Sequence, residues 1–94
     1  AYFIVRCTYK NMDAYQNYAK YAGIAVNKFN GRFIIKGTEE QYQKEIGTHQ
    51  KTVVVEFNTI LDAKSCYQCD DYQKAIKYIL NSSSRDFIIT EGLE

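Results

Sequence analysis

Residues 51–57 read KTVVVEF, and this stretch decides the fold more than any other part of the chain. Three consecutive valines suit the pleated, buried backbone of a strand, because β-branched side chains pack well there. Residues 2–9 (YFIVRCTY) are also rich in β-branched and aromatic side chains and predict a second strand. Shorter runs of the same kind, RFIIK and DFIITE, predict two more strands at 32–36 and 86–91.

Helical patterns separate these strands. Apolar side chains recur every three or four positions after Asn11, whose side-chain oxygen suits the cap of a helix. Asn30 and Gly31 both tolerate the left-handed conformation that ends a helix. Helices are expected at 12–29, 60–68 and 72–81, with a polar connection at 38–50 and a serine-rich breaker at 82–84.

The resulting order, β-α-β-β-α(α)-β, is the split βαβ arrangement of ferredoxin-like folds, in the α+β class. We expect a four-stranded antiparallel sheet with the first and third strands at its centre and the helices on one face. Because side chains alternate along a strand, the more apolar sets face the helices. These sets are Phe3, Val5 and Cys7, and Val53, Val55 and Phe57.

The opposite face of the predicted sheet has no covering element. At its centre lie Ile4, Arg6, Val54 and Glu56, which make it half apolar and half charged. Such a surface is unfavourable in water, and docking two sheets face to face would remove it. The sequence therefore predicts a homodimer that encloses a barrel-like interior, a dimeric α/β barrel.

Length and charge exclude several classes of protein. The 94 residues predict a single domain, 1–94, and 46% of them are apolar, enough for a packed core. Twelve basic residues against eleven acidic ones indicate neither nucleic acid nor a membrane surface as partner. No apolar run approaches the ~20 residues of a membrane helix. With three cysteines and no leader, a cytoplasmic location is expected.

Several runs resemble one family nearly end to end. They are NGRFIIKGT (30–38), VVVEFNTILDAKSCY (53–67), DDYQ (70–73) and ITEG (89–92). Together they are similar to the bacterial domain-of-unknown-function 1330 family, short proteins of the dimeric α/β-barrel superfamily. The resemblance implies a ferredoxin-like homodimer and no particular reaction. The chain departs from the family pattern at Asn30, Lys36, Thr38, Cys66, Asp70 and Ile79.

Two motifs have the residue types of catalytic or metal sites. Cys66 and Cys69 have CxxC spacing, but they lie at the end of a predicted helix rather than before one, so we expect two half-buried thiols and no metal or cofactor. His49 is the only histidine, in a polar loop without a triad partner. It is expected in solvent, or at a pocket if the loop folds over the barrel mouth.

The charged residues of the sheet are the better candidates for a ligand pocket. Arg6 and Glu56 either form a structural ion pair at the dimer interface, or one of them anchors a ligand. Arg32 and Lys36 share a face and either supply positive charge to a pocket edge or protect an edge strand. Glu91 is similarly ambiguous. Tyr67 and Tyr72 are further candidates that could border a pocket between the sheet and the second helix.

Two functions are compatible with these residues. One is a small homodimeric binding or accessory protein that holds an apolar or carboxylate-bearing molecule. The other is a cofactor-independent enzyme of the monooxygenase or isomerase type, suggested by superfamily analogy. An enclosed apolar cavity of ~300 Å³ or more with His49, Glu56 or a tyrosine at its wall would favour the enzyme. A filled interior with Arg6 paired to Glu56 would favour the binding or structural protein.

Overall fold

A computed structural model describes residues 1–93 of the chain. Its four strands form one antiparallel sheet in the order β2-β3-β1-β4. The central strands are β1 (Tyr2–Tyr9) and β3 (Lys51–Glu56), and the edge strands are β2 (Arg32–Ile35) and β4 (Ser83–Thr90). The predicted α+β, ferredoxin-like layout is confirmed, while the sheet itself is open and does not close into a barrel.

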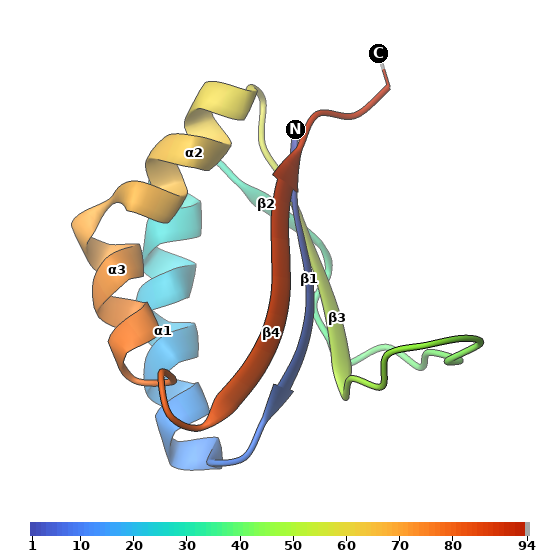
Figure 1. Cartoon of the computed structure of the whole chain (residues 1–94). Helices are drawn as coiled ribbons and strands as arrows, with labels where there is room; N and C mark the ends of the chain where they lie inside the picture. The colour runs from blue at the N-terminus through green and yellow to red at the C-terminus, as the bar shows by residue number, and fades with distance from the viewer. Residues whose placement is uncertain (94) are drawn as a thin grey trace.

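Three helices cover one face of this sheet and leave the other uncovered (Figure 1). They are α1 (Met12–Lys28), α2 (Ile60–Gln68) and α3 (Asp70–Lys77). The Asn11 side chain accepts a hydrogen bond from the Ala14 amide at the start of α1, as its cap position predicts. Among the described residues 1–93, no helix has the length and apolar composition that crossing a bilayer requires.

The core lies between the helices and the covered face of the sheet. Alternate residues of β1 are buried there, and Phe3, Val5 and Cys7 are on the helix side as predicted. Val55 and Phe57 are buried beside them, and Tyr72 of α3 packs tilted against Phe3 with ring centroids 6.0 Å apart. The assignment of sheet faces from alternation is therefore confirmed.

The boundaries of two elements differ from those that the sequence predicts. Helix α3 begins at Asp70 and ends at Lys77, earlier at both ends than the predicted 72–81. Carboxylates are favourable in the first turn of a helix, and Asp70 and Asp71 both lie there. Strand β4 begins at Ser83 because Ser83 and Ser84 pair with the end of β1. Pairing with β1 outweighs the low strand preference of serine.

The turn after α1 uses its two residues differently from the prediction. Asn30 adopts the left-handed conformation, with φ of 61°, as expected. Gly31 has an ordinary φ, so the backbone conformation does not require glycine there. Neighbouring side chains instead lie too close to leave room for a Cβ. A Cβ there would lie 2.8 Å from carbon atoms of both Phe57 and Val26.

The surroundings of two glycines predict opposite effects of the same substitution. A Cβ at Gly23, inside α1, meets no atom within 4 Å, so Gly23→Ala should raise the free energy of unfolding by roughly 0.5–1 kcal/mol. Gly31→Ala should lower it by about 1–3 kcal/mol through overpacking against Phe57. Urea unfolding of both variants measures the difference. Equal effects at the two positions would contradict the packing described here.

Candidate functional site

A cavity of about 340 Å³ lies between α1 and the covered face of the sheet. Aromatic and aliphatic side chains line it from both sides. Helix α1 contributes the small residues Ala19, Ala22 and Gly23, which leave room between helix and sheet. Four tyrosines stand at the wall of the cavity, namely Tyr9, Tyr15, Tyr18 and Tyr72.

The hydroxyls of Tyr18 and Tyr72, two residues of the cavity wall, meet Arg85, which is not itself among the residues that line the cavity. The two hydroxyl oxygens are 2.7 Å apart and share a hydrogen bond. Arg85 donates through Nη2 to the Tyr18 hydroxyl at 3.1 Å and to the Tyr72 hydroxyl at 2.8 Å. The guanidinium carbon also lies 4.9 Å from the ring centroid of Tyr18 and 5.1 Å from that of Phe87. We call Arg85, Tyr18 and Tyr72 the arginine–tyrosine cluster.

The hydroxyls of this cluster keep their protons. Burial is the largest effect on both rings, and it raises the pKa of Tyr18 and of Tyr72 above the ordinary value of 10.0. Burial also raises the pKa of Tyr9 and of Tyr15. At neutral pH the tyrosines at the cavity wall are therefore hydrogen-bond donors and cannot act as bases.

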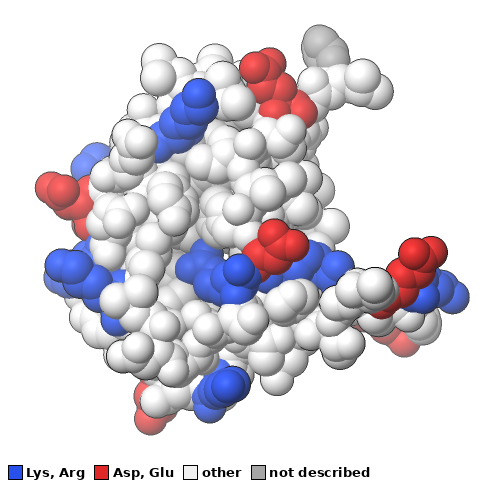
Figure 2. Space-filling view, in the orientation of Figure 1, with Lys and Arg blue, Asp and Glu red and all other residues white. Residues whose placement is uncertain are grey.

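Arg85 carries a positive charge that forms no ion pair with a carboxylate of residues 1–93. Within residues 1–93, the two ion pairs join Lys28 to Asp71 and Arg32 to Glu56, and neither includes Arg85. The Nε atom of Arg85 is buried and has no hydrogen-bond partner among the described residues. Figure 2 shows basic atoms recessed between the helices and β4, where the surface is hollowed. A buried, unbalanced cation is costly unless an anion joins it.

The residues predicted from sequence are distributed over three places. Lys36 and Tyr72 line the cavity. Tyr67 packs behind its wall, with its ring centroid 5.3 Å from that of Tyr72. Arg32, Glu56 and Glu91 border a separate, open groove near the N-terminus.

Arg6 and His49 lie outside both the cavity and the groove. Arg6 donates through Nη2 to Oε1 of Gln43 at 2.6 Å, on the uncovered face. His49 is half-buried, with Nδ1 3.4 Å from the Thr8 hydroxyl. The structure thus places neither of them beside the other predicted site residues.

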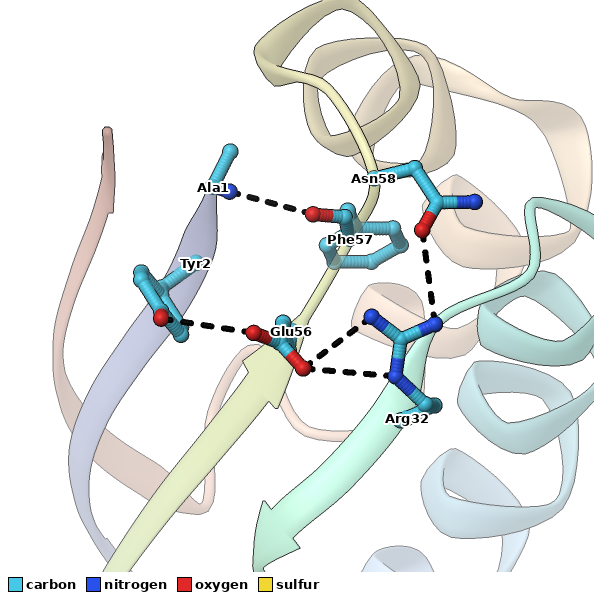
Figure 3. Close-up of polar contacts among 6 residues, drawn as sticks. All are labelled: Ala1, Tyr2, Arg32, Glu56, Phe57 and Asn58. Carbon is cyan, nitrogen blue, oxygen red and sulfur yellow. Dashed lines mark hydrogen bonds and ion pairs between the residues drawn. The ribbon is translucent and has the colours of Figure 1, made fainter. Parts of the chain in front are cut away.

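The expected Arg6–Glu56 ion pair does not form within the protomer, because Glu56 pairs with Arg32 instead (Figure 3). Nη2 of Arg32 lies 3.0 Å from Oε1 of Glu56, and the Tyr2 hydroxyl donates to Oε2 at 3.4 Å. The strand register explains the difference, since Arg32 and Tyr2 are both directly opposite Glu56, whereas Arg6 is opposite Thr52. Alternation predicted the face, and only the register decides the partner.

The three cysteines differ in their burial. Cys7 and Cys66 are fully buried, and Cys69 is half-buried at the start of α3. Burial raises the pKa of the Cys66 thiol to about 12, which is the opposite of what a redox nucleophile needs. In the part of the chain that the structure describes, no three His, Cys, Asp or Glu residues gather closely enough to hold a metal ion.

Comparison with known families now adds to this geometry. The sequence profile of the family described as domain of unknown function (DUF1330) matches residues 1–93. The chain belongs to this family. A search of curated proteins finds no significant match for this DUF1330 chain.

Two solved structures share the fold of this DUF1330 protein. The crystal structure of RPA0582, a protein of unknown function from Rhodopseudomonas palustris, has a TM-score of 0.66 at 9% identity, over 98% of this chain and 82% of that chain. A structure of methylated RPA0582 gives 0.67 at 13% identity, over 97% and 80% of the two chains. At this identity the likeness shows the fold alone.

Of the arginine–tyrosine cluster of this DUF1330 chain, the sequence predicts only Tyr72 as a pocket residue and does not point to Arg85 or Tyr18. The predicted last strand begins at Asp86 and the serine-rich breaker ends at 84, so Arg85 lies between them and is assigned to no face of the sheet. Had the strand been extended by one residue, alternation with Phe87 and Ile89 would have placed Arg85 toward the helices. Tyr18 has the spacing of a packing residue in the helix predicted at 12–29, and nothing in the sequence shows which residue meets its hydroxyl.

A double-mutant cycle tests the ion-pair assignment. Arg32→Ala combined with Glu56→Ala should give a coupling energy of about 0.2–1 kcal/mol, because both side chains are partly exposed. Arg6→Ala combined with Glu56→Ala serves as the matched cycle and should give a coupling near zero. Urea unfolding of the single and double variants measures both values. A larger coupling for Arg6 than for Arg32 would refute the register.

Proposed function

We propose that this chain is a single-domain homodimer that binds a small organic molecule in the cavity between α1 and the sheet. The observation that carries the proposal is the cavity itself. The cavity is partly open and measures about 340 Å³, a volume within the range of ligand pockets. Apolar walls with a few convergent polar groups are typical of such pockets. The free thiols support a reducing, cytoplasmic location.

A cofactor-independent enzyme is the second candidate, because the cavity reaches the ~300 Å³ expected of such an enzyme and has tyrosines at its wall. Isomerases and similar enzymes need a base to remove a proton, or a substrate that is already a carbanion. Among the described residues that line the cavity there is no Asp, Glu or His. The tyrosines are protonated, so they can donate a hydrogen bond and stabilise an anion. This donor set supports binding more directly than proton abstraction.

The homodimer is supported by the composition of the uncovered face. Ile35, Val54, Ile4 and Ile88 lie opposite one another in the register and form an apolar row across all four strands. The neighbouring rows carry both signs of charge, with Arg32 and Glu56 on one side and Arg6 and Asp86 on the other. A second copy therefore offers both an apolar row and opposite charges to the first.

The surface area of the protomer agrees with this. Its accessible surface is 6316 Å², whereas a compact monomer of 10.9 kDa exposes about 5,600 Å². The excess of roughly 700 Å² is close to the ~800 Å² that one partner buries in a standard interface. The loop between β2 and β3 projects beyond the uncovered face (Figure 1), and it exposes Tyr42 and Ile46. A second copy on this face would cover both residues.

The oligomeric state can be tested with two matched substitutions. Ile88 on the uncovered face and Ile24 on α1 are 50% and 46% exposed, so a lysine at either position costs the protomer a similar amount. Sedimentation at micromolar concentration should show a dimer for the wild type and for Ile24→Lys, and a monomer for Ile88→Lys. A monomeric wild type, or a dimeric Ile88→Lys variant, would contradict the homodimer.

Ligand binding can be tested without knowing the ligand. Native mass spectrometry of the protein purified from its own host should show a retained small molecule. Gly23 faces open space at the cavity, so Gly23→Leu should fill the pocket and abolish retention, while Gly23→Ala should keep it. Both variants should remain folded. Absence of a retained molecule on the wild type, or its retention by Gly23→Leu, would count against binding in this cavity.

A further inference from the structure

The arginine–tyrosine cluster contains a cation that has no ion-pair partner among residues 1–93, next to two tyrosines that line an apolar cavity. Arg85 is half-buried among aromatic rings, and its charge persists at any physiological pH. Buried arginines are normally paired with a carboxylate. Among the described residues, the hydrogen-bond partners of the guanidinium are the hydroxyl oxygens of Tyr18 and Tyr72, which are neutral. The cluster therefore has a net positive charge that the described chain leaves unbalanced.

The hydroxyl hydrogens of the cluster also indicate that an additional hydrogen-bond acceptor can bind there. Each hydroxyl oxygen accepts a hydrogen bond from Arg85, and one hydroxyl donates to the other. Two hydroxyls carry two hydrogens, so the second hydrogen has no acceptor among the described residues. Since both tyrosines line the cavity, this hydrogen is available to a group inside it. An anionic oxygen fits the position, because it accepts this hydrogen and also balances the guanidinium.

The rest of the cavity limits the size and polarity of the ligand that carries this oxygen. Its walls are aromatic and aliphatic, from Phe3, Val5, Val26, Val55 and Phe87. A volume of about 340 Å³ is at the small end of ligand pockets, enough for a body of one or two rings. Lys36, a second cation at the cavity, is exposed, so water weakens its attraction for an anion.

We infer that the cavity binds a small apolar carboxylic acid, with the carboxylate at the hydroxyls of Tyr18 and Tyr72, next to Arg85, and the hydrocarbon body between α1 and the sheet. This inference rests on the proposed binding function and specifies the chemical class of its ligand. It assigns Arg85 as the residue that selects an acid over a neutral molecule of the same shape. Tyr18 and Tyr72 position the guanidinium and donate the remaining hydrogen bond.

The test compares an acid with its neutral isostere. The probes are 1-naphthylacetate and 1-naphthylacetamide, measured by isothermal titration calorimetry at neutral pH. Because a hydrogen bond to a charged group is worth more than a neutral one, the wild type should bind the acid roughly 10- to 100-fold more tightly than the amide. Arg85→Met should remove this preference and leave the affinity for the amide unchanged, whereas Arg85→Lys should keep part of it.

A matched control distinguishes the effect of the Arg85 charge on acid binding from the effect of the protein's overall charge. Arg32→Met makes the same change outside the cavity and should retain the full preference for the acid. Tyr72→Phe keeps the ring in the core and removes one hydroxyl, so it should reduce the preference without unfolding the chain. This variant provides the answer if Arg85→Met does not fold.

The outcomes distinguish the inference from the proposed function. Equal affinity of the wild type for acid and amide would overturn the assignment of an acid and leave ligand binding in the cavity intact. A preference that survives in both Arg85→Met and Tyr72→Phe would also overturn it. If neither probe binds, the assignment of a carboxylic acid as ligand is overturned. If, in addition, the purified protein retains no small molecule, the proposed binding function is overturned as well.

Discussion

The covering of the sheet on one face only is the constraint on which the rest of this structure depends. A four-stranded sheet has two faces, and a split βαβ order places every helix on the same one (Figure 1). The covered face holds the aromatic core and the cavity. The uncovered face holds a row of branched apolar side chains between rows of charge. Two possible binding surfaces of different kinds thus follow from one topology.

The cavity exists because side chains of unequal size separate α1 from the sheet. Tyr15 and Tyr18 are large residues on the first turns of α1, and they pack against Tyr9 with ring centroids 4.5 and 6.0 Å away. Further along the helix, Ala22 and Gly23 face the sheet and fill little of the space. Large residues at one end hold the helix away from the strands, and small residues in the middle leave the volume unfilled.

The guanidinium of Arg85 is a charged group packed beside an otherwise apolar core. Burial is favourable for Phe3 and Phe87 but costly for the guanidinium of Arg85. Contacts with two aromatic rings and two hydroxyls offset part of that cost. Places where a well-packed fold retains such a costly group are often functional sites. The same reasoning does not apply to Arg32, whose pair with Glu56 is partly exposed to water.

The sequence by itself determined the strands, the faces of β1 and β3 and the order of the fold, because alternation and helical periodicity are local properties of the chain. The tertiary structure alone decided that Glu56 meets Arg32 rather than Arg6, and that Ser83 and Ser84 extend β4. It also decided that Arg85 reaches Tyr18, a residue 67 positions away. These contacts depend on strand register and on the packing of α1 against the sheet, which are set by long-range interactions that no short segment encodes.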